Sequence, residues 1–229
     1  DVYKRQVIPS ADENLRSART AEAVLAAMRQ RGVPRIPQSF LAHSAPARIV
    51  DRLGELDYEA RVDKGDYESE LGLLQGRLAR AARSKKFQDR SLVLVFEGQD
   101  AAGKGGAIRR VTHALDARQF DITPVAAPNS YELSRPYLWR FWRQLPRHGR
   151  VAIFDRSWYG RVLVERVEKL TAPAHWRRAY AEINDFEEQL AASGAIVLKF
   201  WLAVTADVQL ERFKEREKSP FKNCLLYTS

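Results

Sequence analysis

The apolar residues of this chain fall into short continuous runs and into longer segments with helical spacing. Continuous runs, typical of strands, occupy residues 91–96, 151–155 and 195–204. The first two runs are typical of strands that are buried in a sheet. The last of these runs is the most hydrophobic. A shorter run over 122–126 predicts one further strand.

Segments with apolar residues three and four positions apart separate these strands and predict helices. Such a segment covers 66–83, which we expect to lie on the core, and another extends from Lys104 to about Leu115. A longer amphipathic helix ends at Gly194, and Thr205 is a suitable N-cap for the last helix. An aromatic helical stripe before the 151–155 strand is interpreted as core: Tyr137, Leu138, Phe141, Trp142 and Leu145.

The alternation of strands and helices predicts an α/β fold with a parallel sheet and helices on both faces. We expect the 151–155 strand to pair with the 91–96 strand, and the 195–204 strand to lie on the other side of 91–96. The region before these strands is not expected to belong to the sheet domain. The pattern of residues 7–32 predicts a separate helix, and the proline-bearing residues 33–50 are interpreted as a linker.

Composition narrows the class of protein. The 229 residues are 45% hydrophobic and carry a net charge of +9, so an anionic partner is expected. The basic residues are scattered and form no long tract, which argues against a nucleic-acid arm. Neither a membrane-spanning run nor a signal peptide is evident, and the single cysteine, Cys224, suits the cytoplasm.

The stretch from Phe96 to Gly106 is the main candidate for a functional site. It follows an apolar strand and opens an amphipathic helix, as a phosphate-binding loop does. Gly98 and Gly103 let successive backbone N–H groups turn inward, and Lys104 supplies a cation for phosphate. The alternative interpretation is an ordinary turn between strand and helix.

One position departs from the usual nucleotide-binding pattern. Gly105 follows Lys104 where a Ser or Thr normally binds magnesium through its hydroxyl. The metal must then take its oxygens from other residues. Asp100 is the nearest candidate, because a carboxylate among phosphates is repelled unless a divalent cation lies between them.

A second candidate segment follows the 151–155 strand. Asp155 ends that strand and Arg156 comes next, which suits a carboxylate that holds magnesium and a cation that neutralises transferred charge. The alternative is that Asp155 or Ser157 merely caps the helical segment that follows, through Val167. Arg161 and Glu165 lie one helical turn apart, so a simple ion pair between them is also plausible.

Together these motifs resemble the polyphosphate kinase 2 family, most of all the active domain of two-domain polyphosphate:AMP phosphotransferases. The resemblance runs from about Asp63 to Lys222 and rests on EGQDAAGKGG, YLWRFW, DRSWYGRVLVERV and FKER. It implies a P-loop kinase-like three-layer sandwich. It also assigns three groups of residues. The first phosphate motif would contain Gly98, Asp100, Gly103, Lys104, Gly105 and Gly106, and the second motif with its following helix would contain Asp155, Arg156, Arg161 and Glu165. The start of a lid would contain Arg212 and Arg216.

The resemblance implies transfer of a phosphoryl group from inorganic polyphosphate to a nucleotide, AMP in preference to ADP. The catalytic residues would be Asp100, Lys104, Asp155, Arg156 and Arg216. Arg161 and Arg212 would add to the phosphate contacts, and Asp100, Asp155 and Glu165 would hold Mg²⁺ or, alternatively, Mn²⁺. We expect neither nucleic acid nor membrane as a partner, and leave a homo-oligomer open.

The resemblance also predicts the organisation of the chain. Residues 7–32 would be the end of an upstream domain of the same kind, and 51–223 a catalytic domain cut before its lid and last strand are complete. Residues 1–6 and 224–229 resemble translated adapter sequence and are expected to be non-native. Two alternative functions remain: an ATP-dependent nucleoside monophosphate kinase, against which Gly105 argues, and a non-catalytic subunit that binds polyphosphate or nucleotide.

Overall fold

The computed structural model describes residue 51 and residues 53–218. The chain divides into the units Asp1–Gln38 and Ser39–Ser229, and all described residues belong to the second unit. The predictions for residues 1–6, 7–32, 33–50 and 224–229 therefore lie outside the described part, apart from the sequence itself.

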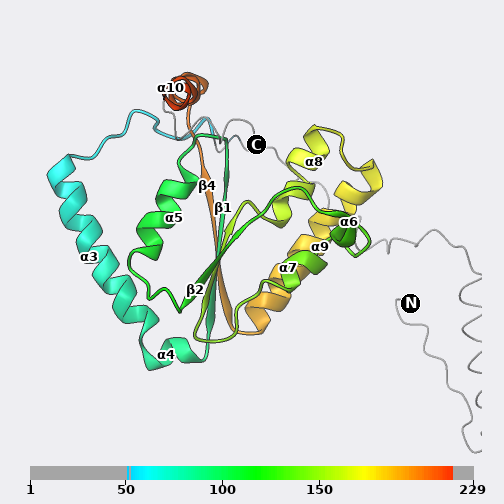
Figure 1. The fold of residues 1–229 in the computed structure, drawn as a ribbon, viewed down its shortest axis with the longest axis horizontal. Coiled ribbons are helices and arrows are strands. Elements are labelled where there is room, and N and C mark those ends of the chain that lie inside the picture. The colour runs from blue at the N-terminus through cyan, green and yellow to red at the C-terminus, as the bar shows by residue number, and fades with distance from the viewer. Residues whose placement is uncertain (1–50, 52, 219–229) are drawn as a thin grey trace, which may run out of the picture. The chain divides into compact units, whose positions relative to one another are not determined.

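The described elements alternate between strand and helix along most of the chain (Figure 1). In chain order they are α3 (Lys64–Ala82), α4 (Lys85–Gln88), β1 (Ser91–Gly98), α5 (Lys104–Thr112), β2 (Phe120–Pro124), α6 (Ser130–Leu133), α7 (Trp139–Trp142), β3 (Val151–Asp155), the 3-10 helix η1 (Trp158–Arg161), α8 (Val164–Val167), α9 (Pro173–Ala192), β4 (Ala195–Leu202) and α10 (Ala206–Glu217).

The strands form a four-stranded parallel sheet in the order β2-β3-β1-β4. This confirms the predicted α/β class and the placement of β3 and β4 on either side of β1. Because all strands run the same way, their carboxyl ends meet at one edge of the sheet. The register pairs Phe96 with Asp155, so the end of β3 lies beside the start of the predicted phosphate loop.

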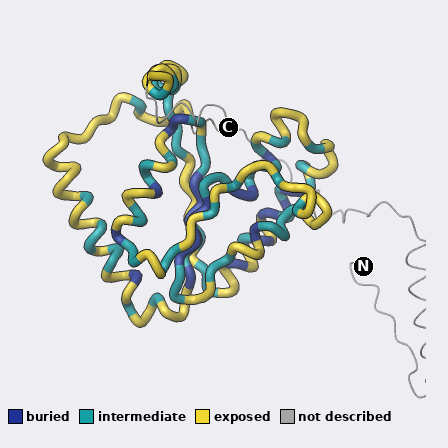
Figure 2. The backbone as a smooth tube through the Cα atoms, viewed as in Figure 1, coloured by how far each residue is buried: buried dark blue, intermediate teal, exposed yellow. Residues whose placement is uncertain are grey.

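Helices cover both faces of the sheet, as predicted: α5 with α3 beyond it on one side, and α7, α8 and α9 on the other (Figure 1). Alternate residues of β1 enter the two cores. Val93 and Val95 join the cluster on the α9 side, whereas Leu94 and Phe96 join the smaller cluster on the α5 side. The central strands β1 and β3 are accordingly the most buried part of the described chain (Figure 2).

One burial prediction is wrong. Of the residues in α3, only Ala82 is buried, and Leu73 remains 62% exposed, because α3 lies outside α5 and does not reach the sheet. The most hydrophobic strand, β4, is an edge strand whose Leu198 and Phe200 stay exposed. An apolar run therefore predicted a strand correctly but not how deeply it is buried.

The aromatic stripe before β3 is core only in part. Its helix is limited to α7, in which Phe141 is 2% exposed. Tyr137, Leu138 and Leu145 pack against the cluster on the α9 side, whereas Trp142 makes an edge contact with Phe186 of that cluster but remains 43% exposed. Within the described residues, no helix is long and apolar enough to cross a membrane.

Candidate active site

The phosphate-loop candidate connects the carboxyl end of β1 to the first turn of α5, as the sequence predicts. Gly103 is the N-cap of α5 and has a left-handed backbone, with φ of 104°. Such a conformation favours glycine, and it turns the chain so that the first N–H groups of α5 face the loop. The positive end of the helix dipole is thus directed at the place where an anion would bind.

Gly98 is required for a reason that the sequence did not reveal. Its φ is 130°, and a Cβ atom at this position would lie 2.1 Å from the carbonyl oxygen of Leu202 in β4. Strand β4 therefore approaches the start of the loop too closely for any side chain. Gly105 is different, because a Cβ there would meet no atom within 4 Å.

Lys104 folds over the loop from the first turn of α5. Its Nζ donates to the carbonyl oxygens of Gly98 at 2.9 Å and Gln99 at 3.0 Å, and it lies 3.9 Å from Oδ1 of Asp100. Burial lowers the pKa of the Lys104 ammonium, while the carboxylates of Asp100 and Asp155 act in the opposite direction. The cation is thus held at the loop by backbone carbonyls, where a phosphate could replace the carboxylate contact.

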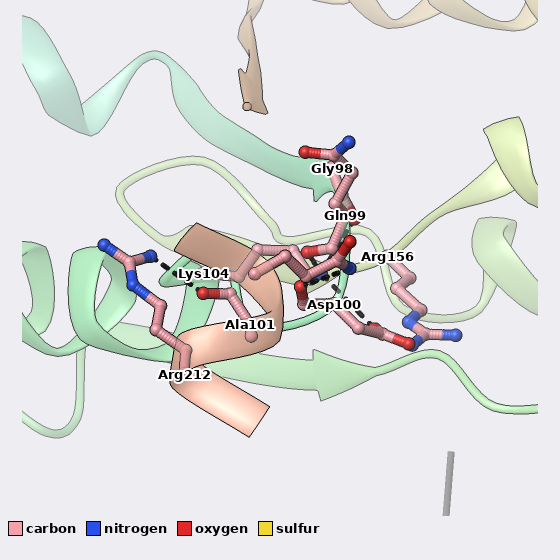
Figure 3. A network of polar contacts seen from close by, with 8 residues as sticks. Gly98, Gln99, Asp100, Ala101, Lys104, Arg156 and Arg212 are labelled. Atoms are coloured by element: carbon pink, nitrogen blue, oxygen red, sulfur yellow. Dashed lines mark hydrogen bonds and ion pairs between the residues drawn. The ribbon is translucent and has the colours of Figure 1, made fainter. Parts of the chain in front are cut away.

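Asp100 and Arg156 connect the two motifs directly. Nη2 of Arg156 donates to Oδ1 of Asp100 at 2.7 Å, and Figure 3 shows the two side chains meeting next to Lys104. The backbone of Arg156 is left-handed, with φ of 65°, and its N–H donates to the carbonyl oxygen of Phe96 at 2.9 Å. Asp155 and Arg156 are therefore tied to β1 immediately before the loop. The N-cap of η1 is Ser157, the second capping candidate, and not Asp155.

A partly buried polar contact that the sequence did not predict joins Ser157 to Glu97, at the end of β1. Oγ of Ser157 donates to Oε1 of Glu97 at 2.7 Å and accepts from the N–H of Tyr159. Burial raises the pKa of the Glu97 carboxyl, although Ser157, Lys104 and Arg156 each oppose the shift. Glu97 immediately precedes Gly98, and an acid at the end of a buried strand was the signal that could have identified it.

The aromatic residues after Arg156 anchor the second motif in the core. Trp158 is fully buried and makes edge contacts with Phe141, Phe154 and Phe186. Its indole N–H donates to Glu187 at 3.0 Å, and the hydroxyl of Tyr159 donates to the same carboxylate oxygen at 2.7 Å. Burial raises the pKa of Tyr159 to about 12, so this phenol remains a proton donor.

Arg161 and Glu165 form the simple ion pair considered as an alternative, with Nε and Oε2 3.0 Å apart. The Arg161 guanidinium also donates to Thr171 at 2.8 Å and lies 4.1 Å from the ring centre of Tyr137. Within the described part of the chain, these contacts connect the pair to Tyr137 before α7 and to Thr171 after α8, and not to the loop. Their predicted roles in binding phosphate and metal stay predictions.

The two arginines predicted to begin a lid, Arg212 and Arg216, both belong to α10 but differ in position. Nη1 of Arg212 donates to the carbonyl oxygen of Ala101 at 2.8 Å, so this side chain reaches the loop (Figure 3). The Arg216 guanidinium lies 5.9 Å from the ring of Phe213 on its own helix. Gly106 lies in the first turn of α5, where a Cβ would approach the Arg110 guanidinium at 3.1 Å.

The carboxylates present fit a magnesium ion only if substrate completes its coordination. Among the described residues, no three His, Cys, Asp or Glu side chains gather into a metal site. Asp100 and Asp155 both act on Lys104, which places their charges at the same edge of the sheet. Mg²⁺ is commonly held by one or two carboxylates together with substrate phosphates and water, so this pair suits it.

Comparison with known proteins agrees with the arrangement of the motifs. The family model "Polyphosphate kinase 2 (PPK2)" matches residues 61–227. A polyphosphate:AMP phosphotransferase of Pseudomonas aeruginosa is 52% identical over 220 residues, and an ADP-polyphosphate phosphotransferase of Rhizobium meliloti is 38% identical over 158 residues. These alignments cover 94% and 69% of this chain, but 44% and 56% of those proteins.

A solved structure extends the agreement to the fold. The crystal structure of a protein from Pseudomonas aeruginosa PA01 superimposes with a TM-score of 0.82 at 50% identity, and covers 95% of this chain and 45% of that one. This chain thus spans less than half the length of the two matched proteins from Pseudomonas aeruginosa. The family match over residues 61–227 includes both motifs and all of α10, and the chain belongs to the polyphosphate kinase 2 family.

Proposed function

We propose that this protein transfers the terminal phosphoryl group of inorganic polyphosphate to AMP, giving ADP. The observation that carries the proposal is the pairing of Phe96 with Asp155, which sets a carboxylate and Arg156 beside a phosphate-type loop. The preference for AMP is supported by identity, because the relative named for AMP is 52% identical and the relative named for ADP is 38% identical.

In this proposal the protein acts mainly by positioning charge. Phosphoryl transfer needs the attacking and leaving oxygens in line and cations around the moving group, with little covalent help from protein. Lys104 and Arg156 lie at the loop and would grip the phosphates, while the N–H groups at the start of α5 add further donors. Arg216, Arg161 and Arg212 are proposed as additional cations around the polyanion.

Asp100 and Asp155 are the proposed magnesium ligands. When bound, the metal would neutralise charge on the phosphate oxygens. Binding requires Asp100 to leave Arg156, and the cost is small because an exposed ion pair of this kind contributes only about 0–1 kcal/mol. Glu165 is a less favourable ligand, because its ion pair with Arg161 is more buried than the pair of Asp100 with Arg156, and breaking it would cost more.

A magnesium titration tests the role of Asp100. The Asp100→Asn variant should need more magnesium for half-maximal rate, because it loses one of the few protein oxygens available to the metal. A lower turnover with an unchanged magnesium requirement would assign Asp100 to orienting substrate instead.

We also propose that residues 51–223 form the catalytic domain and that the protein acts in the cytoplasm. The family match over residues 61–227 supports the first point, and the single cysteine supports the second. Both follow from sequence patterns. A homo-oligomer is left open.

The decisive experiment compares phosphoryl donors and acceptors. Purified protein is incubated with Mg²⁺, AMP and either polyphosphate or ATP, and ADP formation is followed by chromatography; parallel reactions contain ADP or GDP as acceptor. We expect ADP from AMP and polyphosphate, and loss of that product in Lys104→Ala. Transfer from ATP alone would indicate a nucleoside monophosphate kinase, and polyphosphate binding with no transfer would indicate a non-catalytic subunit.

A further inference from the structure

The phosphate loop contains a residue whose backbone is disfavoured. Ala101 has a φ of 62°, and its side chain is only 6% exposed. A residue with a Cβ atom rarely adopts this left-handed conformation, and it persists only where surrounding contacts hold it. The loop therefore needs contacts that fix both peptide groups around Ala101.

Helix α10 supplies such contacts from the far end of the chain. Nε2 of Gln209 donates to the carbonyl oxygen of Asp100 at 2.9 Å, and Nη1 of Arg212 donates to that of Ala101 at 2.8 Å. Gln209 and Arg212 are three residues apart and thus lie on one side of the helix. Figure 3 shows Arg212 extending from α10 to the Ala101 carbonyl.

A third contact joins the same two segments. The N–H of Val204, between β4 and α10, donates to Oε1 of Gln99 at 3.0 Å. Thr205 then caps α10 by accepting from the N–H of Val208. The loop residues Gln99, Asp100 and Ala101 are therefore all held by residues 204–212.

These hydrogen bonds fix the backbone where it is disfavoured. The carbonyl of Asp100 lies in the peptide plane before the Cα atom of Ala101, and the carbonyl of Ala101 lies in the plane after it. Holding both planes fixes the two dihedral angles of Ala101. Because N–H and C=O point in opposite directions across a trans peptide, the N–H of Ala101 is turned away from α10.

We propose that Gln209 and Arg212 are positioning residues that hold the phosphate loop in its binding conformation. They act through the Asp100 and Ala101 carbonyls, so Arg212 orders the loop in addition to any attraction it exerts on polyphosphate. Helix α10 is in this way coupled to the loop. The functional part of the proposal rests on the polyphosphate activity proposed above, but the ordering of the loop does not.

The first test measures loop order without substrate. Hydrogen exchange of the peptide covering residues 96–106 is compared in wild-type protein, Gln209→Ala, Arg212→Ala and the control Glu211→Ala, which alters an exposed residue on the same helix. We expect faster exchange in the first two variants and wild-type exchange in the control. Gln209→Met, which removes the donor but keeps the volume, serves if Gln209→Ala unfolds.

The second test measures steady-state kinetics with polyphosphate. Loss of one such hydrogen bond should raise KM about threefold to tenfold, with a larger effect for Arg212→Ala. Adding Ala101→Gly should recover part of the loss in each variant, because glycine adopts a positive φ without the steric cost. Ala101→Gly alone provides the baseline of the cycle.

The outcomes separate the two roles of Arg212. Faster loop exchange together with rescue by Ala101→Gly supports positioning. Unchanged exchange overturns it, as does an activity loss that Ala101→Gly does not rescue, since Arg212 would then act on substrate directly. If wild-type protein transfers nothing from polyphosphate, the proposed function fails while the exchange experiment still decides on loop ordering.

Discussion

The phosphate loop and the segment after β3 lie side by side but are held by different forces. The segment after β3 is held by packing, because Trp158 is buried among aromatic rings of α7, β3 and α9. The loop is held by polar contacts from Lys104, Arg156, Gln209 and Arg212. Packing gives a fixed reference position for Asp155 and Arg156, whereas polar contacts can be exchanged for contacts with phosphate.

This difference predicts which property of the protein a substitution in each region will change first. A change in the packed segment should first lower the free energy of unfolding. A change in the loop should first alter substrate binding or turnover, because its contacts are partly exposed and individually weak.

The largest effect is expected for Trp158→Ala. Removing a fully buried tryptophan should lower the free energy of unfolding by about 3–5 kcal/mol, through lost burial and the cavity left behind. Urea unfolding followed by circular dichroism measures the change. Trp142→Ala is the matched control, because Trp142 is 43% exposed and should cost much less. Equal losses in the two variants would contradict the role of packing.

Lys104→Ala and Asp155→Asn should leave the fold intact but lower turnover by about a hundredfold or more, since in the proposed function each removes a charge that acts on the reacting phosphates. Steady-state kinetics and unfolding curves should be measured on the same samples. Lys64→Ala, which removes an exposed lysine of α3, is the control. Turnover like that of wild type in either variant would remove that residue from the mechanism.

Two glycines of the loop sharpen the comparison further. Gly98→Ala should destabilise the protein by about 1–3 kcal/mol, because its Cβ would overlap the Leu202 carbonyl and its φ is positive. Gly105→Ala has open space and should change the free energy of unfolding by less than about 0.5 kcal/mol. Thermal and urea unfolding check both values. A destabilised Gly105→Ala would mean that this turn is more crowded than the structure shows.

The smallest expected effect is on the pH dependence of the free energy of unfolding. Because burial raises the pKa of Glu97 above its ordinary 4.5, the native state binds this proton more tightly than the unfolded state does. The contribution of Glu97 to stability is therefore complete below pH 4.5 and is lost as the pH rises through the native pKa. Glu97→Gln cannot ionise, so its stability relative to wild type should increase over that window and then level off.

Urea unfolding in magnesium-free buffer between about pH 4 and pH 8 measures this difference. The amide oxygen that Glu97→Gln introduces can still accept from Ser157, which limits other changes. Parallel pH profiles for Glu97→Gln and wild type would show that the Glu97 carboxyl is not responsible.

Much of the fold could be predicted from local patterns. The apolar runs located β1, β3 and β4, and the glycine-rich stretch after β1 located the loop and the start of α5. Thr205 was correctly predicted as the N-cap of α10. These features depend on residues close together in the chain, where hydrophobic period and backbone preference act directly.

Other features depend on which elements become neighbours. The exposure of α3 and β4 depends on which elements pack against them, and an apolar residue does not by itself specify its packing partners. The aromatic stripe at Tyr137 to Leu145 has the same helical spacing throughout, yet Trp142 lies at the surface.

By itself, the sequence determined the α/β class, the family, and the candidate residues Lys104, Asp155 and Arg156. Only the tertiary structure showed that Gly98 must accommodate the Leu202 carbonyl and that Ser157 donates to the half-buried Glu97. The tertiary structure also showed that α10 holds the backbone of the loop. The physical reason is that hydrogen bonds between residues about a hundred positions apart, such as Gln209 with Asp100, form only after the parallel sheet has brought the ends of β1 and β4 together.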